Sequence, residues 1–277
     1  MHFLQIVWEP ASEGIQLFGN FKIHYYSMMW MAAFICGWYI MKNVYKHENQ
    51  TEDQLDSLFI YSVLGIMIGA RLGHVIFYQP ELFKQDFFSI FLPFRFRPEF
   101  EFTGFRGLAS HGAAIGMIIS MYLYNNKVLK KSVLWILDRI VIPVALGAIF
   151  VRIGNFFNSE MIGKPVDESL PWAIVFKSLD NVPRHPGQLY EAFGYVFVFV
   201  ILWVLYWKTK KSEQTGFLFG LFLVLLMSVR LFVEQFKIEQ VIGRDDWILT
   251  LNTGQVLSIP FIVVGLYFMF LYKQKVA

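Results

Sequence analysis

The sequence predicts an all-α polytopic membrane protein, and two observations predict it: the composition and the spacing of long apolar stretches. Of the 277 residues, 56% are hydrophobic and only 16% are charged, and 30 are phenylalanine. Soluble domains carry roughly 25% charged residues and about 45–50% apolar ones. The mean hydropathy of +0.48 also agrees with a chain that is largely embedded in a bilayer.

Seven stretches meet the requirement for a transmembrane helix, which needs about 20 mostly apolar residues. In chain order they cover residues 24–41, 57–77, 108–124, 133–152, 188–207, 216–236 and 253–272. No internal repeat and no low-complexity linker divides the chain, so we expect one transmembrane domain over residues 1–277. The connections 78–107 and 153–187 are long and rich in Pro, Phe and charge, and we expect them to form an outward-facing cap.

The short connections predict the orientation, because lysine and arginine collect in short cytoplasmic loops. Lysines follow the first, third, fifth and seventh predicted spans, at Lys42 and Lys46, at Lys127, Lys130 and Lys131, at Lys208, Lys210 and Lys211, and at Lys273 and Lys275. The N-terminus and both long loops are therefore expected outside, and the C-terminus in the cytoplasm. The long loops carry basic residues too, but the rule gives short loops the greater weight.

Several classes of function lack the residues they need. The net charge of +3 comes without a basic run with interleaved aromatic residues, so we expect no nucleic-acid partner. The single cysteine, Cys36, excludes an intramolecular disulfide and a multi-cysteine metal site. The sequence has no His-Glu-x-x-His, no paired-Asp metal motif and no Gly-x-Ser-x-Gly elbow, which argues against metalloproteases and serine hydrolases.

The most informative polar cluster closes the apolar run from Trp135 to Val151. It reads Arg152-Ile-Gly-Asn155-Phe-Phe-Asn158-Ser-Glu160-Met-Ile-Gly163. An arginine at the bilayer centre costs about 2.5–3.5 kcal/mol on insertion scales, so a chain that carries one usually supplies an anionic partner. We therefore look for the chemistry in this cluster.

Other spans also carry polar groups, and each has a structural alternative. Arg71 lies in Gly69-Ala-Arg71-Leu-Gly73 and is either an interhelical hydrogen-bond donor or a substrate ligand. His111 begins the third span at the expected depth of Arg152, although a lone histidine in a membrane helix is often structural. Arg230 and Glu234 are spaced for pairing with each other on one helix, but a buried pair is a poor device for stability alone.

Two further residues lie at the outer ends of spans. His185 stands in Arg184-His185-Pro186-Gly187-Gln188-Leu-Tyr190-Glu191, where Pro186 and Glu191 are ordinary features of a helix start. It is either a second acid/base candidate or part of a helix cap. Tyr26 is either a site residue or an aromatic of the interfacial belt.

The joint pattern favours function, because Tyr26, His111, Arg152, Asn155, Glu160, His185 and Arg230 come from five spans or their flanks. Arginines at this depth suit an anionic lipid, whose phosphate accepts paired hydrogen bonds from a guanidinium.

The same motifs resemble the bacterial prolipoprotein diacylglyceryl transferases, over about residues 20–272. The resemblance rests on the cluster from Arg152 to Gly163 and on motifs in the same chain order: Arg71 within Gly-Ala-Arg-Leu-Gly, His111-Gly112, His185-Pro186-Gly187-Gln188-Leu189-Tyr190-Glu191, Arg230-x-x-x-Glu234 and Gly254-Gln255-Val-Leu-Ser258-Ile-Pro260. Departures are modest: Ser27 stands where a glycine is common, and Gly187 replaces a frequent serine.

The resemblance implies a reaction in the bacterial cytoplasmic membrane. Such enzymes transfer the diacylglyceryl group of phosphatidylglycerol to the lipobox cysteine of a prolipoprotein, whose signal peptide is still attached, and they release glycerol 1-phosphate without a metal or cofactor. By the family pattern Arg152 contacts the headgroup, Arg230 is a second phosphate partner and His111 is the proposed base. Tyr26, Asn155, Glu160 and Gly163 match positions important for activity. We place Arg71, Asn158, His185 and Glu234 with the substrate-binding residues.

These residue types fit that chemistry. A thiol has a pKa near 8.5, so the acceptor needs a base, and a histidine with an ordinary pKa near 6.5 is a plausible one. Whether His111 or His185 takes the proton stays open, as does the division of roles between Asn155 and Glu160. The alternative function is a transporter or flippase that binds an anionic lipid without chemistry, which would not need His111. A structural scaffold does not explain so many polar groups at membrane depth.

Overall fold

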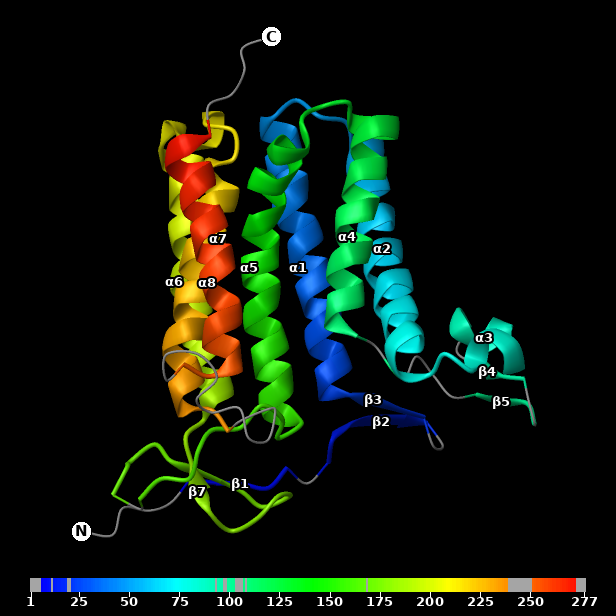
Figure 1. Ribbon diagram of the computed structural model, residues 1–277, viewed down its shortest axis with the longest axis vertical. Helices are drawn as coiled ribbons and strands as arrows, with labels where there is room; N and C mark the ends of the chain where they lie inside the picture. Colours follow the sequence, from blue (N-terminus) through cyan, green and yellow to red (C-terminus); the bar gives the residue numbers. More distant parts are fainter. Residues whose placement is uncertain are drawn as a thin grey trace. The chain divides into compact units, whose positions relative to one another are not determined.

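The computed structural model describes residues 6–10, 12–18, 21–92, 94–96, 99–102, 107, 109–167, 169–238 and 251–272. Every predicted span coincides with a helix (Figure 1). The seven helices are α1 (Tyr25–His47), α2 (Glu52–Tyr78), α4 (Ser110–Tyr124), α5 (Val133–Phe157), α6 (Gly187–Lys208), α7 (Phe217–Val233) and α8 (Thr253–Leu266). The protein is therefore mostly helical, as predicted.

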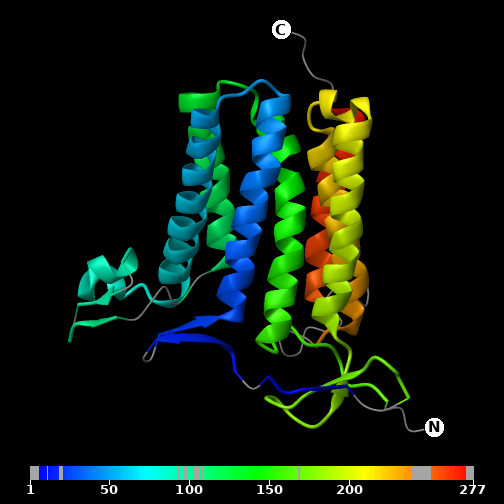
Figure 2. The same cartoon turned by 180° about the vertical axis from the view of Figure 1, so that it is seen from behind.

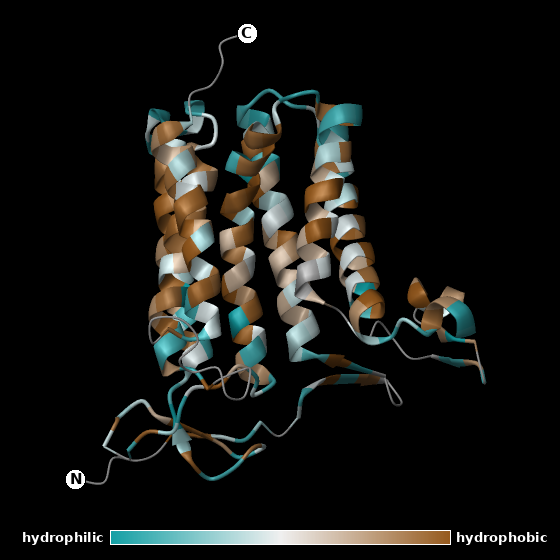
Figure 3. Cartoon of the chain, viewed as in Figure 1, coloured by the Kyte–Doolittle hydropathy of each residue, from teal (hydrophilic) through white to brown (hydrophobic). Residues whose placement is uncertain are grey.

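Five of these helical segments are long and apolar enough to cross a membrane: Glu52–Tyr78, Val133–Phe157, Gly187–Lys208, Phe217–Phe236 and Thr253–Leu271. Apolar residues run along the helices while polar ones gather toward their ends (Figure 3). The chain is a multi-pass membrane protein.

The end of α5 differs from the prediction, because the helix continues past residue 152 to Phe157. Hydropathy falls at Arg152, but backbone helical hydrogen bonding does not depend on side-chain polarity.

The chain divides into two compact units, one formed by Met1–Met41 with Leu137–Ala277 and the other by Lys42–Ile136. We call them the first and second unit. Whether they act as the single domain expected from the sequence stays a prediction.

In the second unit, α2 and α4 pack through glycines. A Cβ on Gly69 would lie 2.4 Å from the carbonyl oxygen of Gly112, and a Cβ on Gly116 would lie 2.1 Å from that of Gly65. Only residues without a side chain permit this approach, which is the small-residue packing common in membranes. The hydroxyls of Tyr45 and Tyr124, 2.9 Å apart, add a buried hydrogen bond.

The connection between α2 and α4 is folded. It contains α3 (Leu82–Gln85), the 3₁₀ turn η1 (Phe87–Ile90) and an antiparallel pair of short strands, β4 (Phe94–Arg95) and β5 (Glu101–Phe102). After α4, one π-helical turn, η2 (Asn125–Leu129), ends at Lys130 in the left-handed conformation, with φ of 55°.

In the first unit, α6, α7 and α8 lie side by side, and α1 lies along α5 (Figures 1 and 2). The carbonyl oxygen of Gly265 would lie 2.6 Å from a Cβ on Gly220, so α7 and α8 also touch through glycine. At one end, Asp138 accepts hydrogen bonds from the backbone N–H groups of Gly216 and Phe219 and so caps α7. The short turns of this unit are η3 (Lys210–Glu213), η4 (Glu234–Phe236) and η5 (Tyr267–Leu271).

The opposite end of the first unit carries two small sheets. The strand β1 (Ile6–Trp8) pairs in parallel with β6 (Ile174–Phe176), with Ile6 opposite Ile174, and β7 (Pro183–Arg184) pairs antiparallel with β6. The strands β2 (Gly14–Phe18) and β3 (Phe21–His24) form a hairpin that leads into α1. The polar cluster described next lies at this end, where α5 and α7 finish and α6 and α8 begin.

Candidate active site

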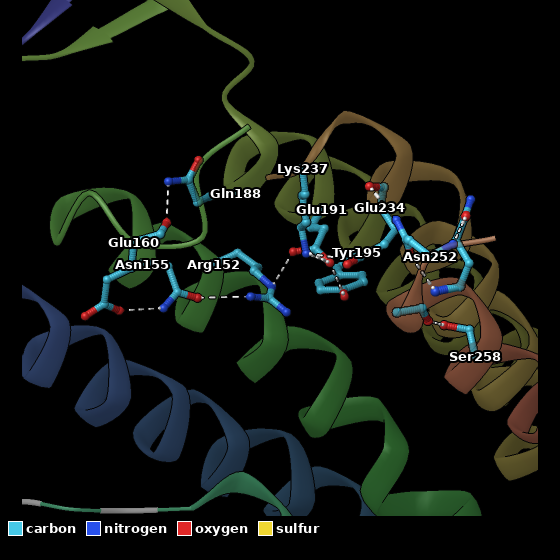
Figure 4. Close-up of polar contacts among 12 residues, drawn as sticks. Arg152, Asn155, Glu160, Gln188, Glu191, Tyr195, Glu234, Lys237, Asn252 and Ser258 are labelled. Carbon is cyan, nitrogen blue, oxygen red and sulfur yellow. Dashed lines mark hydrogen bonds and ion pairs between the residues drawn. The ribbon is translucent and has the colours of Figure 1, made fainter. Parts of the chain in front are cut away.

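The last turn of α5 folds its own polar side chains into a chain of hydrogen bonds (Figure 4). Arg152 donates from Nη1 to Asn155 Oδ1 at 3.1 Å, and Asn155 donates from Nδ2 to Glu160 Oε2 at 3.1 Å. Asn158 donates to the other oxygen of Glu160 at 3.3 Å. Because Ser159 takes a positive φ of 55°, the chain reverses after the helix and carries Glu160 back over Asn155.

A buried carboxylate from α6 holds the other side of Arg152. The side chain of Glu191 is fully buried, and its Oε2 lies 2.8 Å from Arg152 Nε. Its Oε1 lies 2.9 Å from Nζ of Lys237, whose side chain is only 3% exposed (Figure 4). The hydroxyl of Tyr195 is 3.5 Å from the same Oε1. A carboxylate buried in this way is tolerated because two cations and a hydroxyl surround it.

Beyond Lys237 the network reaches α7 and α8. Glu234 Oε2 lies 3.5 Å from Lys237 Nζ. A Cβ on Gly254, in the first turn of α8, would lie 2.4 Å from the carboxyl carbon of Glu234, so a side chain at this position would displace the Glu234 carboxyl group. Asn252 caps α8 and also donates to the carbonyl oxygen of Glu234.

Arg230 is not paired with Glu234 in the way that the spacing on one helix allows. Within the part of the chain that the structure describes, its buried Nε has no hydrogen-bond partner, and the Glu234 carboxylate contacts Lys237 instead. The structure therefore shows a partner for Glu234 other than Arg230. Among the described residues the network itself contains three carboxylates, Glu160, Glu191 and Glu234, and two cations, Arg152 and Lys237.

Gly163 lies where the loop after α5 meets the loop before α6. Its N–H donates to the carbonyl oxygen of His185 at 3.0 Å, and a Cβ at this position would lie 2.3 Å from that oxygen. Gly163 also forms an isolated β-bridge with Lys237. The absence of a side chain at Gly163 therefore lets three segments meet: the loop after α5 that carries Glu160, the loop before α6, and the segment at Lys237.

His185 is held by aromatic neighbours. Its Nδ1 lies 2.9 Å from the Tyr190 hydroxyl, which accepts a hydrogen bond from Trp172 Nε1 at 2.8 Å, and its ring packs on Phe236. The indole N–H of Trp172 can only donate, so the Tyr190 hydroxyl accepts that bond and is free to donate its own hydrogen to Nδ1 of His185. Burial lowers the pKa of the His185 imidazole, which keeps the ring neutral. These contacts fit the interpretation of His185 as part of a cap.

Tyr26 lies in the first turn of α1 and is half-buried. A Cβ on Gly154 would lie 2.8 Å from Cδ2 of Tyr26, so the ring rests on α5 one residue before Asn155. A purely lipid-facing belt aromatic would not make this contact.

Known proteins resemble this chain over nearly all of its length. A sequence model of the prolipoprotein diacylglyceryl transferases matches residues 13–271. A protein of Bacteroides fragilis named phosphatidylglycerol–prolipoprotein diacylglyceryl transferase is 41% identical over 98% of this chain and 97% of its own. Proteins with the same name are 38% identical in Tolumonas auensis, over 98% of this chain and 99% of theirs, and 39% identical in Chloroherpeton thalassium, over 96% and 93%. The chain belongs to the prolipoprotein diacylglyceryl transferase family.

Two of the predicted site residues, Arg71 and His111, lie in the second unit. The Arg71 guanidinium donates to the backbone carbonyls of Ser89, Ile90 and Gly107, at 3.0, 3.1 and 3.4 Å. These bonds tie the α2–α4 connection to α2, so they supply the structural role that the sequence left open. A direct role of Arg71 in substrate binding stays a prediction. His111 lies in the first turn of α4, and its side chain lies outside the described residues.

Sequence reasoning missed Glu191 and Lys237 as members of the site. The sequence pattern around Glu191 is that of an ordinary helix start, although a carboxylate four residues into a membrane helix requires a partner. Lys237 follows the sixth span and belongs to none of the motifs named from the sequence. The signal for both was their charge beside an apolar run. The structure shows no group of three or more His, Cys, Asp or Glu able to hold a metal among its described residues.

Proposed function

We propose that this protein transfers the diacylglyceryl group of phosphatidylglycerol to the lipobox cysteine of a prolipoprotein. The products are a thioether-linked lipid on the protein and glycerol 1-phosphate. The observation that carries the proposal is the pair of arginines at the polar end of the first unit. Arg152 is oriented by Glu191 and Asn155, and Arg230 has no hydrogen-bond partner at Nε within the described residues. An anionic phosphate supplies what such an arginine lacks.

In this proposal the cysteine sulfur attacks the glyceryl carbon that carries the phosphate ester. The new carbon–sulfur bond forms as the carbon–oxygen bond to phosphate breaks, and the thiol proton passes to a base. His111 is that base, and charge grows on the departing phosphate, where Arg152 and Arg230 stabilise it in a place with little water.

The other predicted residues support this arrangement. Asn155 holds Arg152 through Nη1, and Glu160 in turn holds Asn155, so both orient the guanidinium toward the substrate. Gly163 lets the loops before α6 and after α5 meet, and Tyr26 packs on Gly154, which precedes Asn155 in the chain. Asn158, His185 and Glu234 bind substrate at this same end of the first unit. Arg71 binds substrate from the last turns of α2, just before the α2–α4 connection begins.

We further propose seven membrane spans, with α1 and α4 joining the five long apolar helices. The protein lies in the bacterial cytoplasmic membrane with its N-terminus outside, its C-terminus in the cytoplasm and its two long connections as an outer cap. An exported prolipoprotein then presents its cysteine on the side of Glu160. On a Cys36→Ala background, a membrane-impermeant thiol reagent applied to intact cells should label Lys177→Cys and not Lys130→Cys. Labelling of Lys130→Cys alone would invert the protein and exclude an exported substrate.

A transporter of anionic lipids would use the same arginines without covalent chemistry. The two functions are separated by incubating purified protein with phosphatidylglycerol vesicles and a lipobox peptide. The transferase adds the mass of one diacylglyceryl group to the peptide, and a Cys→Ser peptide stays unmodified. A transporter would move labelled lipid between leaflets and leave both peptides unchanged.

A further inference from the structure

The connection between α2 and α4 presents an unusual number of aromatic side chains on its surface. We call its residues 81–102 the aromatic arm. Six of its phenylalanines are 39–69% exposed: Phe83, Phe87, Phe88, Phe91, Phe96 and Phe100. A contiguous exposed apolar patch of this kind marks a surface that another apolar phase covers.

The exposed rings are carried by a folded framework. Arg71 binds the carbonyls of Ser89 and Ile90, and the side chain of Ile90 is fully buried. Asp86, 6% exposed, accepts a hydrogen bond at Oδ2 from the backbone N–H of Phe96 at 2.7 Å.

The rings also contact one another. Phe87 and Phe91 have centroids 5.8 Å apart, and Phe94 and Phe100 stack at 5.4 Å. The exposed phenylalanines therefore belong to a folded segment in which Asp86, Ser89 and Ile90 are buried.

The apolar surface of the arm continues that of a membrane helix. At the end of α2, Ile76, Phe77 and Tyr78 are 54%, 72% and 71% exposed. The arm begins directly after them and lies beside this end of α2 in both views (Figures 1 and 2). It also carries exposed polar residues, among them Glu81 and Lys84. Short segments with Phe on one face and charge on another lie in the boundary between headgroups and acyl chains.

We propose that the aromatic arm is an interfacial anchor. Its phenylalanines insert into the headgroup–acyl boundary of the leaflet at the C-terminal end of α2, and the partner of this surface is the lipid bilayer. The anchor fixes the depth in the membrane of the backbone at Ser89 and Ile90, whose carbonyl groups accept hydrogen bonds from Arg71. This inference rests on the membrane crossing of α2 and is independent of the proposed transfer reaction.

The test places an environment-sensitive fluorophore at single cysteines in the full chain, on the Cys36→Ala background. The labelled positions are Phe88→Cys and Phe100→Cys in the arm, with Ile68→Cys in the middle of α2 as a hydrocarbon reference and Lys177→Cys, an exposed residue after β6, as a water reference. Each protein is reconstituted in phosphatidylcholine–phosphatidylglycerol vesicles that carry a quencher either near the headgroup or deep in the acyl chain. Two arm positions are used so that one poorly folded variant does not decide the result.

We expect both arm labels to emit at shorter wavelength than the Lys177 label and to be quenched more by the shallow quencher than by the deep one. Emission and quenching like those at Lys177 would overturn the proposal, because the arm would then lie in water. Stronger deep than shallow quenching, as at Ile68, would also overturn it by placing the arm in the hydrocarbon core. Shielding that arises only when a signal peptide is added would assign the surface to a protein partner instead.

Discussion

Replacing Glu191 with alanine removes the carboxylate on which the network of the first unit converges. The change leaves Arg152 without its contact at 2.8 Å and Lys237 without its contact at 2.9 Å, in a place where the lost side chain was fully buried. Breaking a buried ion pair on one side costs about 3–5 kcal/mol, since an uncompensated charge stays behind. At about 2–4 °C per kcal/mol for a chain of this size, Tm should fall by about 6–20 °C.

Glu191→Gln separates stability from orientation. The amide keeps the shape and one acceptor, so it should cost less, on the order of the 1.5–3 kcal/mol of a hydrogen bond to a charged group. Arg152 nevertheless loses the charge that fixes Nε, and transfer should fall by about tenfold or more, which corresponds to about 1.4 kcal/mol of transition-state stabilisation. Thermal unfolding in detergent and peptide lipidation measure the two effects. The control is Glu213→Gln, an exposed carboxylate in η3. An unchanged Tm for Glu191→Ala, with normal turnover, would refute the reasoning.

Three further predictions concern the proposed reaction. Arg152→Lys should lose most transfer activity at matched expression although its charge is kept, because a lysine cannot contact Glu191, Asn155 and a phosphate in a planar fork; near-normal turnover would argue against the assignment. His111→Gln should fold and bind phosphatidylglycerol yet be nearly inactive, whereas His185→Gln should be impaired less, and the reverse order in the lipidation assay would move the base to His185. Gly163→Ala should lower both Tm and activity, because its Cβ would lie 2.3 Å from the His185 carbonyl oxygen, and a wild-type melting curve would contradict this.

The helices could be predicted because hydropathy alone specifies a membrane span. Each apolar stretch became a helix, and Gly69 and Gly73 lie at a close helix contact, as the small-residue spacing suggested. The end of α5 was placed too early, since a polar side chain such as Arg152 ends a hydropathy stretch without ending backbone hydrogen bonding.

The part of the site that is local in sequence was also predictable. Arg152, Asn155 and Glu160 lie within nine residues, and the structure joins them directly. Contacts between distant segments left little signal. Glu191 and Lys237 lie 46 positions apart in the chain, and no sequence motif indicates that the two residues are in contact. The acceptors of Arg71 are backbone carbonyls, which any residue supplies.

The most direct test of the central claim is a measurement of both products in one reaction. Purified protein is incubated with phosphatidylglycerol and a lipobox peptide, and the lipidated peptide and released glycerol 1-phosphate are quantified together over time. Transfer of the diacylglyceryl group predicts equal amounts of the two products, and neither product with a Cys→Ser peptide. Lipid that is bound or moved while the peptide keeps its original mass would contradict the account.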